Sequence, residues 1–114
     1  MTGADLDNTF VALSDPTRRG VIDLLRQKPR RAGELANALS MTPPAMTRHL
    51  RMLRDTGLVE EAALEEDARV RVYSLKHAPF SAIRRWLDEV ETFWAGELDA
   101  FKEHAERTRG KRRA

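Results

Sequence analysis

Apolar residues recur with the spacing of a helix face through the first half of the chain. This spacing predicts four helices, over residues 5–13, from 16 to before 29, over 32–39 and over 43–56. The period then changes to two, which predicts strands over 58–64 and 69–75 around a polar turn. A fifth helix is predicted to open at Pro79 and to reach Arg107. We therefore expect a mostly helical domain with a small β-hairpin between the fourth and fifth helices.

The ends of the predicted helices carry recognisable start and stop residues. Asp15 and Thr42 are suited to cap a helix N-terminus, and each is followed by a proline at the first helical position. Gly57 stands where a helix commonly ends in a left-handed residue. Ser40 and Met41 form a tight break between the third and fourth helices.

Length and composition limit the possibilities further. A chain of 114 residues fits one small domain, and 41% hydrophobic residues give only a modest core, so burial against a second copy would add stability. The absence of cysteine excludes disulfides, thiolate metal sites and a cysteine nucleophile. The polar start, with Asp5 and Asp7, and the lack of a long apolar run predict no signal peptide, no membrane span and a cytoplasmic location.

The net charge of +2 hides an uneven distribution. Residues 16–54 hold nine basic and two acidic residues, whereas residues 58–106 hold six basic and twelve acidic ones. The last eight residues add five cations, and we expect residues 107–114 to be a disordered basic tail behind a domain of residues 1–106. Such a tail could attract DNA nonspecifically or be a solvated end. The basic segment is either an electrostatic footprint for a polyanion or an ordinary charged face.

Two short helices joined by a tight turn, the second capped and basic, are typical of a helix-turn-helix. At 100° per residue, Met46, Leu50 and Leu53 share one side of the second helix. The opposite side carries arginines and small residues, and its carboxylate, Asp55, comes at the far end. Arginine and threonine can contact bases and phosphates in the major groove, so we favour double-stranded DNA over a basic surface helix without a partner. The candidate contacts here are Thr42, Pro44, Ala45, Thr47, Arg48 and Arg51.

The run from Phe10 to Arg19, the run from Thr42 to Val59 and the strand from Arg71 to Leu75 resemble the ArsR/SmtB family of bacterial repressors. With the tryptophan-bearing last helix, the resemblance covers about residues 5 to 106. It implies a winged helix-turn-helix homodimer joined through its first and last helices. It also implies repression through a pseudo-palindromic operator. The sequence does not identify the inducing signal, for which an unknown small-molecule inducer is one candidate.

Two departures from the family pattern matter. The third helix lacks the cysteines of metal-sensing members, and His104 stands alone in the last predicted helix. The resemblance therefore implies the branch without metal ligands, and we expect no metal and no cofactor. The wing is acidic, and Glu60, Glu61, Glu65, Glu66 and Asp67 leave Arg69 and Arg71 as its candidate DNA contacts. A metal sensor with oxygen and histidine ligands stays an alternative.

The last predicted helix carries a broad apolar stripe with two tryptophans and two phenylalanines. It either packs on its own domain or forms a dimer seam, and we favour the seam. The candidate interface residues are Leu6, Phe10, Trp86, Leu87, Val90, Phe93, Trp94, Leu98 and Phe101. The same helix could instead bind another protein, which makes a protein-interaction module the alternative function.

The sequence offers no enzymatic constellation. His49, His77 and His104 are scattered, and neither a nucleophile with its base nor a phosphate-cradling glycine loop is present. We therefore expect no catalytic residues. His49, beside the core side of the fourth helix, is interpreted as a packing or phosphate-contact residue.

Overall fold

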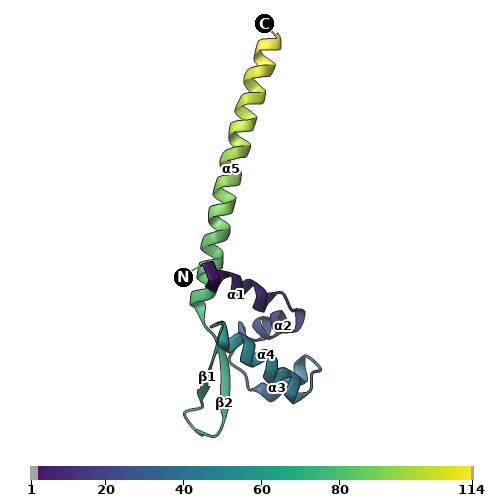
Figure 1. Ribbon diagram of the computed structural model, residues 1–114, viewed down its shortest axis with the longest axis vertical. Helices are drawn as coiled ribbons and strands as arrows, with labels where there is room; N and C mark the ends of the chain where they lie inside the picture. Colours follow the sequence, from purple (N-terminus) through teal and green to yellow (C-terminus); the bar gives the residue numbers. More distant parts are fainter. Residues whose placement is uncertain (1–2, 114) are drawn as a thin grey trace. The chain divides into compact units, whose positions relative to one another are not determined.

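The computed structural model describes residues 3–113 of the chain. Five helices and one antiparallel hairpin follow one another in the predicted order (Figure 1). They are α1 (Gly3–Leu13), α2 (Pro16–Leu25), α3 (Ala32–Ala38), α4 (Pro43–Asp55), β1 (Val59–Ala63), β2 (Arg71–Leu75) and α5 (His77–Arg113). The expected class, mostly helical with a small hairpin, is confirmed.

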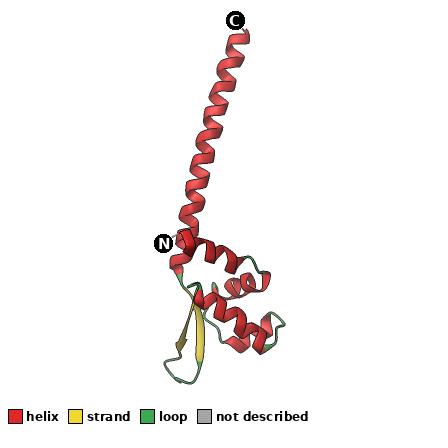
Figure 2. Ribbon diagram, viewed as in Figure 1, coloured by secondary structure: helices red, strands yellow, loops and turns green. Residues whose placement is uncertain are grey.

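The chain divides into two units, Met1–Ala82 and Ile83–Ala114. The first unit contains α1 to α4, the hairpin and the start of α5, and Figure 2 shows these helices beside the two strands. The second unit is the remainder of α5. A single domain over residues 1–106 therefore stays a prediction.

The core of the first unit is assembled from every one of its helices up to α4 and from the start of β1. Its buried apolar residues are Ala12, Val21, Leu25, Leu35, Ala36, Met46, Leu50, Leu53, Leu58 and Val59. The apolar side of α4 predicted from the sequence is confirmed, since Met46, Leu50 and Leu53 are each at most 1% exposed. Because this side of α4 is buried, the opposite side of the helix faces solvent.

The turn between α3 and α4 is closed by backbone hydrogen bonds. Ser40 has a φ of 53°, a left-handed conformation that is uncommon for a residue other than glycine. The amide of Met41 donates to the carbonyl oxygen of Ala36 over 2.9 Å, and that of Ser40 donates to Asn37 over 3.3 Å. These two bonds satisfy carbonyls at the end of α3 and reverse the chain toward α4.

The end of α4 has the same motif, here with glycine. Gly57 has a φ of 79°, its amide donates to Arg54 over 3.0 Å, and the amide of Leu58 donates to Leu53 over 2.9 Å. The next two residues, Leu58 and Val59, are both buried in the core. The predicted helix stop at Gly57 is confirmed, and α4 continues into β1 without a flexible linker.

The strands are shorter than predicted but pair in a simple register. Val59 lies opposite Leu75, Glu61 opposite Tyr73 and Ala63 opposite Arg71. The prediction that the strands cover 58–64 and 69–75 was too long, because the Asp67 carboxylate accepts from the backbone of Arg69 and holds a turn beyond them.

A short bridge adds a third strand-like segment to the hairpin. Arg30, in the linker between α2 and α3, exchanges two backbone hydrogen bonds with Tyr73, at 3.0 and 2.8 Å. This pairing covers the inner edge of β2 and ties the hairpin to the helices. The hairpin is therefore fixed to the first unit by its start at Val59 and by the Arg30–Tyr73 bridge.

Helix α5 differs from its prediction at both ends. It begins at His77, two residues before Pro79, because proline is tolerated in a first helical turn whose amides have no helical partner. It continues to Arg113 through the segment that was expected to be disordered. Lysine and arginine are good helix formers and are favourable near a helix C-terminus. None of the described helices is long and apolar enough to cross a membrane.

Candidate nucleic-acid interface

The exposed side of α4 carries two arginines directed away from the core. Arg48 and Arg51 are both exposed, in contrast to the buried Met46, Leu50 and Leu53. Among the residues that the structure describes, neither guanidinium makes a hydrogen bond or an ion pair. Each side chain therefore keeps its five N–H donors for a ligand.

The N-terminal end of α4 is lined by small side chains. Thr42, Pro44 and Thr47 are exposed and Ala45 is half-buried. The Thr42 hydroxyl accepts from the amide of Ala45 over 3.3 Å, which confirms the predicted cap, and the Thr47 hydroxyl donates to the carbonyl of Pro43 over 2.9 Å. This end of the helix is narrow enough to approach the floor of a groove.

A polar network fastens α4 to the junction of α1 and α2. Arg18 donates from Nε to the carbonyl oxygen of Ala12 over 2.7 Å, and its Nη1 lies 3.4 Å from Nδ1 of His49. Asp15 caps α2 by accepting from the amide of Arg18 over 2.9 Å, and this bond lowers the pKa of the Asp15 carboxyl. Nδ1 of His49 also lies 4.0 Å from Oδ2 of Asp15. The His49 ring therefore faces Arg18 and Asp15 of the same chain.

The two predicted arginines of the wing are both engaged by carboxylates. Arg69 binds Asp67 through Nε and Nη2, each at 3.2 Å, and this contact lowers the pKa of the Asp67 carboxyl. Arg71 donates from Nε to Oε1 of Glu61 over 2.8 Å. The wing is thus less basic in effect than its arginines suggest.

Glu61 accepts hydrogen bonds from three side chains that come from two elements, α4 and β2. Besides Arg71, Nη1 of Arg54 donates to its Oε2, and the Tyr73 hydroxyl donates to the same oxygen over 3.3 Å. The hydrogen bond from Arg71 is the main reason that the pKa of Glu61 is lowered. Burial of the hydroxyl, followed by the nearby Glu61 charge, raises the pKa of Tyr73.

Sequence reasoning missed this cluster. It counted Glu61 among the wing carboxylates that repel DNA and did not single out Arg54. A signal existed in part, because Glu61 opposite Tyr73 puts it diagonal to Arg71 on the same face of the hairpin. The contribution of Arg54 depends on how α4 packs on β1, which no local pattern gives.

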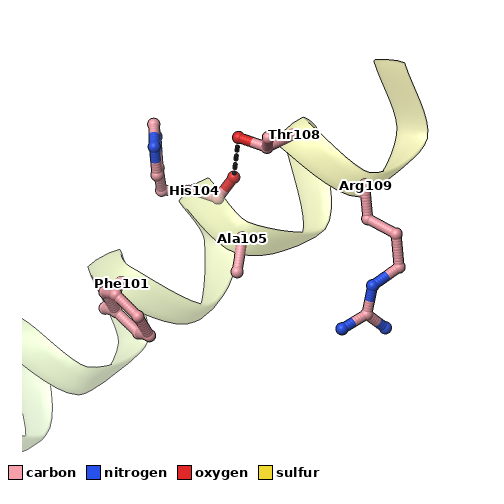
Figure 3. A pocket seen from close by; sticks show the side chains of 5 residues that line it. All are labelled: Phe101, His104, Ala105, Thr108 and Arg109. Atoms are coloured by element: carbon pink, nitrogen blue, oxygen red, sulfur yellow. Dashed lines mark hydrogen bonds between the residues drawn. The ribbon is translucent and has the colours of Figure 1, made fainter. Parts of the chain in front are cut away.

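The apolar residues proposed for a dimer seam lie on two elements. On α5 all of them are exposed, from 41% for Trp86 to 72% for Phe101, and on α1 Phe10 is 40% exposed whereas Leu6 is half-buried. Figure 3 shows Phe101, Ala105 and Arg109 beside a hollow of about 330 Å³ on α5, which His104 and Thr108 also line. Because one helix supplies all of these residues, the hollow is a shallow surface feature.

A second pocket of about 270 Å³ lies in the first unit. It is lined by Leu13, Arg19, Ile22, Asp23 and Phe80, none of which belongs to α4 or the hairpin. Among the described side chains, no group of three or more histidine, aspartate or glutamate residues is placed to hold a metal ion. Neither feature adds residues to the candidate interface, which consists of α4 and the adjoining wing.

A helix-turn-helix whose second helix exposes arginines and continues directly into a β-hairpin defines a winged helix-turn-helix DNA-binding regulator. The chain belongs to the arsR family of bacterial regulatory proteins, whose family model matches residues 15–61. That match begins at the cap of α2 and ends at Glu61, so it contains the whole helix-turn-helix. The family is one of transcriptional regulators and not of enzymes, as expected.

Two curated relatives support this assignment. The HTH-type transcriptional regulator Rv2034 of Mycobacterium tuberculosis is 34% identical over 95 residues, which are 83% of either chain. The transcriptional repressor SdpR of Bacillus subtilis is 34% identical over 56 residues, 49% of this chain and 62% of that one.

Solved structures share the fold. An ArsR-like transcriptional regulator from Rhodococcus sp. RHA1 has a TM-score of 0.76 and 31% identity, covering 93% of this chain and 97% of that one. The homodimeric winged helix-turn-helix domain of Mb0332 from Mycobacterium bovis has a TM-score of 0.59 and 22% identity, covering 83% and 82%. The winged helix-turn-helix predicted from the sequence is confirmed.

Proposed function

We propose that this regulator is a dimeric repressor that inserts α4 into the major groove of a pseudo-palindromic operator. The observation that carries the proposal is the exposed side of α4, where Arg48 and Arg51 make no hydrogen bond or ion pair with the described part of the chain. A bidentate arginine pairs with guanine, or binds phosphate, and both modes need these unoccupied donors. Repression is supported by the similarity to SdpR, which is itself a transcriptional repressor.

The N-terminal end of α4 and its exposed middle have separate tasks in this proposal. Thr42, Pro44, Ala45 and Thr47 form the small end that enters the groove, and the two arginines reach the base edges or the backbone beside it. Arg69 and Arg71 on the wing would contact the backbone in spite of their carboxylate partners. The acidic wing would limit this contribution, since carboxylates and phosphates repel one another.

Dimerisation through α1 and α5 is part of the same proposal. The exposed stripe of α5, with Phe93 at 69% and Trp94 at 62%, has the aromatic content that is typical of an interface core. The similar domain of Mb0332 is described as homodimeric. A two-fold dimer would present two copies of α4 to half-sites about one helical turn of DNA apart, which matches a pseudo-palindromic operator.

The test is selection of bound fragments from the source genome, followed by fluorescence anisotropy on the selected duplex. Arg48→Ala is expected to weaken binding by about 1–3 kcal/mol if Arg48 reads a base. Arg84→Ala removes the same charge from an exposed position on α5 and serves as the control. The proposal fails if no fragment is enriched, or if the two variants bind the selected duplex equally well.

A further inference from the structure

One carboxylate holds two arginines that come from different elements. Arg54 lies in the last turn of α4, Arg71 opens β2, and both donate to Glu61 in the middle of β1. The Glu61 side chain is only 17% exposed, whereas those of Arg54 and Arg71 are 47% and 51% exposed. The carboxylate is therefore the covered centre of the cluster, and the guanidinium groups form its outer rim.

Most of the donors on this rim are unused. Arg54 bonds Glu61 through Nη1 and Arg71 bonds it through Nε, and neither makes another hydrogen bond within the described residues. A guanidinium has five N–H groups, so each arginine keeps donors for a second anion. Two cations and one carboxylate leave the cluster with one net positive charge.

We infer that Glu61 is a positioning residue that holds Arg54 and Arg71 as a pair for one backbone phosphate of duplex DNA, where α4 meets the wing. Ordering long side chains before binding removes a cost that each would otherwise incur in the complex. A phosphate suits the pair, since arginine presents a planar fork to phosphate oxygens. The inference rests on the proposed DNA binding and adds a residue that strengthens it despite its negative charge.

The sign of one substitution distinguishes this role from simple repulsion. If Glu61 only repelled the DNA, replacing it with alanine would increase affinity. If it positions the two arginines, the same replacement decreases affinity, although the protein becomes more positive. Glu60 provides the matched control, because it is the preceding residue on β1, is exposed, and makes no ion pair with a described residue.

The experiment measures binding of a mixed-sequence duplex by fluorescence anisotropy across a range of salt concentrations. Glu61→Ala is expected to bind about two- to tenfold more weakly than Glu60→Ala. Its log–log salt slope is expected to be shallower by about 0.9, the value for one lost phosphate contact. Equal or tighter binding by Glu61→Ala overturns the inference, and so does weaker binding with an unchanged slope.

Two further measurements keep the outcome interpretable. Thermal melting checks that both alanine variants fold, and if Glu61→Ala does not, the near-isosteric pair Glu61→Gln and Glu60→Gln replaces them with the same order of affinities expected. The unsubstituted protein must bind the duplex in a salt-dependent way. If it does not, the proposed function fails, whereas binding without the Glu61 effect removes this inference and leaves DNA binding intact.

Discussion

Arg18 at the start of α2 donates from Nε to the carbonyl oxygen of Ala12 over 2.7 Å and so occupies an acceptor at the end of α1. Its Nη2 reaches the carbonyl of Val11 over 3.2 Å, and its Nη1 faces His49 on α4. The last carbonyls of a helix have no helical partner, and a cation there is favourable. One side chain thus joins three helices.

Replacing Arg18 with alanine is expected to lower the free energy of unfolding by about 1–3 kcal/mol, because it removes the donor of the partly buried Ala12 carbonyl, whereas the Val11 carbonyl keeps Ser14 as a donor. The control is Arg19→Ala. Arg19 is exposed and makes one such bond, to Leu13 over 2.8 Å, so about 1 kcal/mol or less is expected. Urea unfolding followed by circular dichroism measures both. A loss for Arg19→Ala as large as that for Arg18→Ala would contradict the network.

Ser40→Gly is expected to stabilise the protein by about 0.5–1 kcal/mol. Ser40 has a left-handed φ of 53°, which is unfavourable for a residue with a Cβ atom, and glycine removes this strain. The same substitution at Ser81, inside α5, should destabilise the protein by about 0.5 kcal/mol, since glycine is a poor helix former. Thermal melts of the two variants should shift in opposite directions, and a downward shift for Ser40→Gly would refute the prediction.

Acid is expected to destabilise the first unit through Asp15 and Glu61, whose pKa values are lowered in the folded state. A carboxyl with a lowered folded pKa contributes its stabilisation in full above its ordinary pKa. That contribution is lost as the pH falls through the folded pKa. Stability should therefore decline below about pH 4–5.

Asp15→Asn tests this decline, because asparagine still caps a helix but cannot ionise. Its melting temperature should depend less on pH between about pH 6 and 2 than that of the unsubstituted protein. Glu60→Gln removes an exposed carboxylate without an ion pair to a described residue and should leave the pH dependence unchanged. Parallel curves for Asp15→Asn and the original protein would show that the cap charge has no such role.

Trp94→Glu is expected to convert the proposed dimer into monomers, because it places a charge in the apolar stripe of α5. Thr92→Glu introduces the same charge at an exposed position of the same helix, on its polar side, and should leave the dimer intact. Sedimentation velocity distinguishes the two states. The seam would be misplaced if both variants, or neither, dissociated.

Local signals correctly gave the starts of α2 and α4, the end of α4 and its buried side, whereas α2 ends at Leu25, three residues before the predicted limit. Asp15, Thr42 and Gly57 act through neighbours in the chain, so their roles are readable from their order in the sequence. The start of α5 was misjudged because a proline was read as the first helical residue, although the first turn of a helix tolerates it further in. The end of α5 was misjudged because a dense basic segment was taken for disorder.

The site was predictable where it depends on one helix and not where several elements meet. Exposure of Arg48 and Arg51 follows from the apolar side opposite them. The engagement of Arg71 by Glu61, and of Arg54 by the same carboxylate, depends on the register of the hairpin and on its packing against α4. A count of charges therefore predicted that Glu61 repels DNA, whereas in the structure this carboxylate binds Arg54 and Arg71.

The left-handed turn at Gly57 leaves no slack between α4 and β1, since the next two residues are already in the core. We therefore expect α4 and the hairpin to move together, so that the gap between them adapts little to the width of the groove. In the proposed complex, any mismatch would fall on the duplex, which must bend or narrow to fit. Base steps that the protein never touches would then affect affinity through the stiffness of the DNA.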